Sequence, residues 1–100
     1  MKTIAAISAT KCRKDTSDAM PVLQIEHKRL RIAADGTIYY KTEVEYDTGQ
    51  HRKRQTGQWI LVARLKEYVR QDRTKLQQVV NEWLQKLQRA NYEVEVVIYE

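Results

Sequence analysis

The residues of this chain best suited to binding chemistry are basic. The densest group of them directly follows a turn signal at residues 47–49: His51, Arg52, Lys53 and Arg54. Three tyrosines come shortly before the same turn: Tyr39, Tyr40 and Tyr46. Guanidinium and ammonium groups neutralise phosphates, and tyrosine rings offer surfaces on which bases stack. The combination predicts a surface for DNA or RNA. It suits single-stranded or flipped bases, and a β-ribbon entering a major groove is the other mode that it allows.

The same arginines have a structural alternative. Glu43 and Glu45 alternate along the predicted strand before the turn, and residues 41–54 together are close to neutral. A two-residue turn at residues 48–49 places Arg52 and Arg54 opposite these glutamates, whereas a three-residue loop places the arginines on the other face of the sheet. A charge-paired hairpin therefore competes with a phosphate-binding one.

A second basic group lies in the segment 58–75. Lys66, Arg70 and Arg73 recur at offsets 0, 4 and 7, so a helix here carries them on the side opposite its apolar stripe. Such a helix face can lie along a phosphate backbone. The predicted nucleic-acid-binding set comprises Tyr39 and the basic residues of both groups: Arg52, Lys53, Arg54, Arg64, Lys66, Arg70, Arg73 and Lys75.

Residue patterns for catalysis or metal binding are missing from the sequence. His27 and His51 stand alone, with no carboxylate or thiol at a spacing that defines a metal site or a catalytic triad. The one cysteine, Cys12, supplies at most one ligand. The chain has no phosphate-binding loop or dinucleotide fingerprint. We expect a binding protein without cofactor or metal rather than an enzyme.

Charge and length set further bounds. A chain of 100 residues is long enough for one domain with one core. Its net charge is +5. Residues 51–75 hold a local +6, which favours an anionic partner. The apolar run at residues 4–9 is shorter than a signal sequence requires, and no run approaches the length of a membrane span. We expect a cytoplasmic protein that does not bind a membrane.

One helix is strongly predicted at residues 72–91. Its apolar residues recur at offsets 0, 3, 4, 7, 8 and 11, which places them on one face: Leu76, Val79, Val80, Trp83, Leu84 and Leu87. Asp72 is suited to cap the start of the helix, and Asn91 can adopt the left-handed conformation that closes it. The other face carries balanced charges, so we interpret this helix as scaffold and Trp83 as packing.

Three strands are predicted in residues 21–57. A three-residue loop at residues 34–36 pairs Ile32 with Ile38 and gives Gly36 a left-handed conformation. Leu23 and Ile25 are out of phase with this register, which predicts a bulge near residues 26–28. A third strand is expected at about residues 50–56.

The remaining segments complete the expected fold. Residues 58–71 fit a helix, although residues 59–62 alone fit a buried strand. Residues 92–99 alternate as a strand that is buried on one face. Residues 1–20 suggest a short strand at a sheet edge, over residues 2–10, followed by a linker.

The sequence thus predicts a single α+β domain over residues 1–100. Its segments are an N-terminal strand or linker (1–20), a β-meander (21–57), helices (58–91) and a C-terminal strand (92–100), with the antiparallel sheet packed against one or two helices. The first functional hypothesis is a small protein that binds DNA or RNA. The alternative is a protein-interaction module such as an adaptor, inhibitor or accessory subunit, with homodimerisation through the C-terminal strand as one form.

Overall fold

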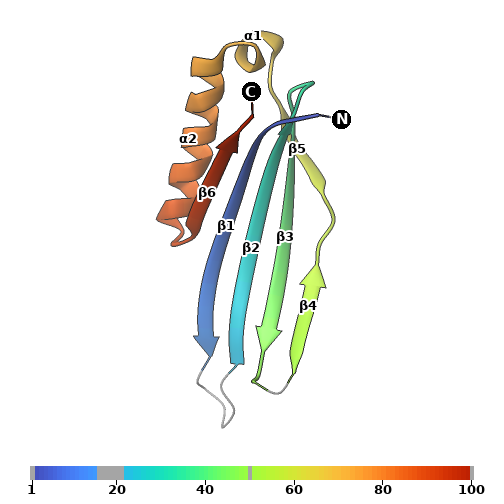
Figure 1. Cartoon of the computed structure of the whole chain (residues 1–100), viewed down its shortest axis with the longest axis vertical. Coiled ribbons are helices and arrows are strands. Elements are labelled where there is room, and N and C mark those ends of the chain that lie inside the picture. Colours follow the sequence, from blue (N-terminus) through green and yellow to red (C-terminus); the bar gives the residue numbers. More distant parts are fainter. Residues whose placement is uncertain (1, 16–21, 50, 100) are drawn as a thin grey trace.

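The computed structural model describes residues 2–15, 22–49 and 51–99. Within these residues one antiparallel sheet is combined with two helices, as the sequence predicts (Figure 1). The elements in chain order are β1 (Thr3–Asp15), β2 (Val22–Ala33), β3 (Thr37–Asp47), β4 (Arg52–Thr56), β5 (Ile60–Arg64), α1 (Glu67–Arg70), α2 (Arg73–Arg89) and β6 (Glu93–Ile98).

The strand order is β4-β3-β2-β1-β6. The outer edge of β3 pairs with two strands: residues 43–47 pair with β4, and residues 37–40 pair with β5. The N-terminal strand is therefore not at an edge, as the sequence suggested, but lies between β2 and β6. It is also longer than predicted, because residues 11–15 continue it. The edge on that side is β6, the predicted C-terminal strand.

The helix α2 begins and ends where its sequence predicts. Asp72 is the N-cap, and its carboxylate accepts hydrogen bonds from the backbone amides of Thr74 and Lys75 at 3.0 and 3.3 Å. Asn91 has a φ of 70° and terminates the helical conformation. The helix packs one side against β1 and β6, and the core consists of Ala5, Ile7, Ala9, Leu30, Ile32, Ile38, Leu76, Val80 and Leu87.

The helix is too short to cover the sheet. A strand of 13 residues is about 43 Å long and a helix of 17 residues about 26 Å, so β1 extends well past α2. Figure 1 shows β1, β2 and β3 continuing beyond the last turn of α2. We call the sheet face that packs on α2 the helix face and the other the open face.

This overhang explains two errors of sequence interpretation. Residues 11–15 are polar and were expected to form a loop, yet they are strand, because neither sheet face is covered there and no apolar side chains are needed. The predicted bulge at residues 26–28 is also absent. The β2–β3 register is regular from Leu23 to Ile32, so Leu23 and Ile25 lie on the open face.

The β2–β3 hairpin has the predicted register. Ile32 pairs with Ile38 and Leu30 with Tyr40, and Gly36 has a φ of +89°. The β3–β4 connection matches neither predicted turn. Asp47 pairs with Arg52 and Glu45 with Arg54, and this register keeps the arginines of β4 on the face of the glutamates.

The segment 58–71 is not a helix, contrary to the prediction. Ile60 pairs with Tyr40 and Ala63 with Ile38, so residues 60–64 form β5, and only residues 67–70 are helical. The strand forms because β4 pairs only with the far part of β3 and leaves the near part of that edge open. Hydrogen bonds to the open backbone groups of β3 therefore decide the structure of this segment, although its apolar residues have helical spacing.

The two left-handed glycines provide a matched pair for a stability test. A Cβ on Gly36 would lie 2.5 Å from the carbonyl oxygen of Leu65, whereas a Cβ on Gly49 would meet nothing within 4 Å. We expect Gly49→Ala to lower the free energy of unfolding by about 1–2 kcal/mol, the cost of a left-handed backbone. Gly36→Ala should lower it further, because the Leu65 carbonyl must also move. Urea unfolding of both variants checks this, and an equal decrease in the two variants would contradict the role of the Leu65 carbonyl.

Candidate functional site

Arg52 and Arg54, which the sequence predicts to contact phosphates, lie on the open face and pair there with Glu45. The Arg54 Nε donates a hydrogen bond to Glu45 Oε1 at 3.1 Å, and the Arg54 Nη2 donates to the same oxygen. Arg52 lies 3.8 Å and His27 3.3 Å from the Glu45 carboxylate. The charge-paired alternative is therefore confirmed for Glu45, whose carboxylate pairs with Arg54 and Arg52.

The neighbouring Glu43 is held in the same way. Lys41 Nζ lies 3.2 Å and Arg29 4.0 Å from its carboxylate. Both glutamates are more than nine-tenths buried beneath these side chains. The Lys41 hydrogen bond lowers the pKa of Glu43, and the Arg54 hydrogen bond lowers the pKa of Glu45, in each case against the effect of burial. The two carboxylates stay ionised.

The predicted basic helix face does not exist as one surface, because its helix is replaced by β5 and the short α1. Arg64 ends β5, Lys66 precedes α1, and Arg73 and Lys75 begin α2. Arg70 has a structural role: its guanidinium donates to the carbonyl of Asp35 at 2.7 Å and so holds the β2–β3 turn.

Tyr39 lies on the open face, where the ring of Trp59 and two cations are also found. The Arg31 guanidinium is 5.4 Å from the centre of the Tyr39 ring and 4.7 Å from that of Trp59. The Lys41 ammonium is 5.6 Å from the Trp59 ring. Cations of the protein therefore lie over both rings, next to the ion pairs that surround Glu43 and Glu45.

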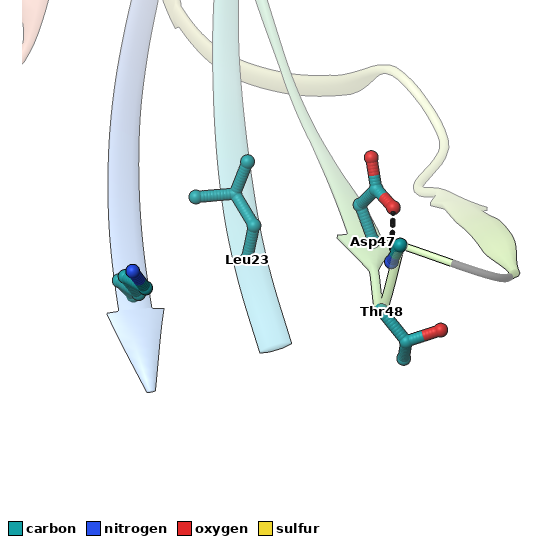
Figure 2. Close-up of a pocket in the computed structure, with 5 residues that line it drawn as sticks. Leu23, Asp47 and Thr48 are labelled. Atoms are coloured by element: carbon teal, nitrogen blue, oxygen red, sulfur yellow. Dashed lines mark hydrogen bonds between the residues drawn. The ribbon is translucent and has the colours of Figure 1, made fainter. Parts of the chain in front are cut away.

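A shallow pocket of about 390 Å³ at the far end of the open face shows little ligand chemistry. Leu23 and Asp47 lie on neighbouring strands there (Figure 2). The Asp47 carboxylate accepts the backbone amide of Gly49 at 2.8 Å, so it serves the turn.

The most basic site is a groove of about 490 Å³ on the helix face, between the C-terminal half of α2 and the overhanging strands. One carboxylate, that of Glu26, lines it among four cationic and three aromatic side chains: Lys11, Arg13, Lys28, Lys86, Tyr40, Trp83 and Tyr92. Val62, Leu87 and Ala90 complete its lining. The groove exists because β1 to β3 extend past the helix while α2 forms its wall.

Both oxygens of the one carboxylate are engaged. The Tyr92 hydroxyl donates to Glu26 Oε2 at 2.7 Å, and the Gln24 amide donates to Oε1 at 3.1 Å. The Tyr92 hydrogen bond lowers the pKa of Glu26, and nearby Arg13 and Lys28 lower it further. Burial and the same hydrogen bond raise the pKa of Tyr92 to about 12. Glu26 therefore stays ionised, and its single negative charge compensates one of the groove's four positive charges.

The lysines of the groove lie over its aromatic rings. Lys11 Nζ is 5.3 Å from the centre of the Tyr92 ring, and Lys28 Nζ is 5.3 Å from that of Tyr40. Lys86 Nζ is 5.1 Å from the Trp83 ring. Lys11 also donates to the carbonyl of Ala90 at 3.0 Å, where the negative end of the helix dipole favours a cation.

The positive surface continues beyond the groove along one row of the sheet. Arg13 pairs with Gln24, Gln24 with Tyr46, and Tyr46 with Lys53, so all four side chains share the helix face. Lys53 is therefore the one member of the predicted basic hairpin that the structure brings to this side.

Sequence reasoning missed Lys11, Arg13, Lys28 and Lys86, because they come from three separate elements and form no cluster in the chain. One local signal was available: Lys11 and Arg13 are two residues apart, which puts them on one face of a strand. Interpreting residues 11–20 as a linker discarded it. Trp83, interpreted as packing, does pack against the core and also lines the groove.

Comparison of the chain with protein-family models, with curated proteins and with solved structures gave no match. Within the part of the chain that the structure describes, neither helix is long and apolar enough to span a membrane.

The Tyr92–Glu26 pair gives a pH-dependence with a defined sign. Because folding raises the pKa of Tyr92 from 10.0 to about 12, the stability from its protonated form is complete below pH 10 and is lost as the pH rises through about 12. We expect the free energy of unfolding to fall across this window, and to fall less in Tyr92→Phe. Urea unfolding across the window measures both. The exposed Tyr99 is the control, since Tyr99→Phe should keep the wild-type dependence.

Proposed function

We propose that this chain binds nucleic acid through the groove on the helix face. The observation that carries the proposal is the groove's composition: four cations and three aromatic rings surround a single carboxylate whose two oxygens already accept hydrogen bonds. Cations supply phosphate contacts, and aromatic rings supply stacking for bases. The row formed by Arg13, Tyr46 and Lys53 extends the same chemistry across the strands.

The site differs from the one that the sequence suggests, although the class of ligand is the same. On the open face, Arg52, Arg54, Arg29 and Lys41 surround two buried glutamates, so half of their positive charge is compensated. On the helix face, the four cations of the groove are compensated by one carboxylate, that of Glu26. The uncompensated charge favours the helix face for a polyanion.

Two matched double variants test the choice of face. Arg13→Gln with Lys28→Gln removes two charges from the groove, and Arg29→Gln with Arg52→Gln removes two from the open face. The first should weaken binding of a labelled oligonucleotide and flatten its salt dependence by about 0.7 in log K per log salt for each phosphate that the variant no longer neutralises. The second should have a much smaller effect. Fluorescence polarisation at several salt concentrations measures both, and equal effects would refute the assignment to the groove.

A second candidate function is self-association, and one observation favours it: β6 is an edge strand. The amide of Tyr99 donates to the Ile4 carbonyl, so alternation directs the backbone groups of Val94, Val96 and Ile98 outward. Unpaired outward groups can accept a strand from a second copy.

The charges of β6 select one register for such a pairing. A two-fold axis at Val96 places Glu95 opposite Val97 of the second copy. An axis at Val94 instead places Glu93 opposite Glu95, and directly opposed like charges destabilise strand pairs. The Val96 register is therefore the favoured one.

This register is testable with substitutions on the exposed side of β6. Val97 is about half exposed, at 49%, so Val97→Glu should leave the monomer folded while it opposes Glu95 of the second copy. We expect this variant to shift a dimer toward monomer. Adding Glu95→Lys should restore the dimer, because opposite charges then face each other. Sedimentation equilibrium measures the association, and a wild-type chain that stays monomeric at all concentrations rules this candidate out.

A further inference from the structure

The groove's aromatic rings are each covered by a cation of the protein. Lys11 and Lys28 lie over Tyr92, at 5.3 and 6.0 Å from its ring centre. Lys28 also lies over Tyr40, and Lys86 lies over Trp83. The same ammonium groups are the groove's phosphate-binding groups. In the free protein, therefore, the lysines that would bind phosphate lie over the rings that would stack on bases.

A phosphate in the groove changes this arrangement. An ammonium group interacts more strongly with an anionic phosphate than with the face of a tyrosine or tryptophan ring at a partly exposed site. Each lysine that moves to a phosphate uncovers the ring beneath it. The uncovered ring is then free to stack on a base that is attached to that phosphate.

The size of the groove limits what can enter. About 490 Å³ lies in the lower part of the range found for sites that hold one small molecule. It suits one or two nucleotides and not the width of a double helix. A base inside a duplex also has both faces covered by its neighbours, so it cannot stack on Trp83 unless it leaves the helix.

We infer that the groove binds unpaired nucleotides of a single strand, with phosphates drawing Lys11, Lys28 and Lys86 off the aromatic rings so that bases take their place. The inference rests on the proposed function and specifies its ligand. It makes phosphate and base cooperative: a phosphate chain without bases gains no stacking, and a base without phosphate must displace the lysines unaided.

The two tryptophans lie on different faces, which allows a direct test. Trp59→Phe leaves Trp83 as the one tryptophan, inside the groove, and Trp59 is a surface residue whose replacement spares the core. Three probes of equal length are titrated into this variant: a single-stranded oligonucleotide, its duplex with the complementary strand, and an abasic strand with the same phosphates. Fluorescence polarisation reports binding, and tryptophan emission reports stacking.

We expect the single strand to quench Trp83 and to bind on the order of tenfold more tightly than the abasic strand or the duplex, as stacking of one base would give. In the complementary Trp83→Phe protein, emission from Trp59 on the open face should stay unchanged. Equal affinity for all three probes, or unchanged Trp83 emission on binding, overturns the inference.

The same titrations separate the two proposals. Binding of all three probes that still weakens with the Arg13 and Lys28 substitutions leaves the proposed function standing and removes only the single-strand inference. Absence of binding to every probe at low salt removes both.

Discussion

The packing of α2 on β1 is the contact from which the other features follow. Ala5 and Ala9 are small side chains that flank Ile7 on the helix face of β1, and all three are almost fully buried. This contact fixes the helix over one end of the sheet, where β1 is an inner strand because it pairs with β2 and β6. Because the helix is the shorter element, the same contact leaves the far part of the sheet uncovered. The groove is the boundary between the covered and uncovered parts, so it is a direct product of this difference in length.

Local signals in the sequence were sufficient for much of this fold. Asp72 and Asn91 delimit α2 through their own backbone conformations, and the left-handed Gly36 sets the register of the β2–β3 hairpin. Features that depend on distant residues could not be predicted in this way. The strand at residues 60–64 forms because part of the β3 edge is left open, which no local pattern reveals. The polar end of β1 is strand because the helix does not reach it, and that depends on the lengths of two separate elements.

The candidate site shows the same division. Charge clusters in the sequence suggested an anionic ligand but did not indicate on which face the cations gather, because consecutive residues of a strand point to opposite faces. Arg52 and Arg54 therefore lie with the glutamates on one face, and Lys53 lies with the groove on the other. The groove's own cations are far apart in the chain and meet only after β1, β2 and α2 have packed. Their convergence is a tertiary property, and single residues gave little sign of it.

The two buried glutamates of the open face have a consequence for how the molecule meets a charged partner at a distance. Since Glu43 and Glu45 keep their charge at pH values below the usual range for glutamate, they cancel much of the positive potential of their own side of the sheet. On the other side of the sheet, the groove has four cations around the single carboxylate of Glu26. Charge that differs in this way between two sides of a sheet gives an electric dipole across the sheet. A polyanion of the kind proposed would exert a torque on this uneven charge and turn the groove forward before contact, which raises the frequency of productive encounters.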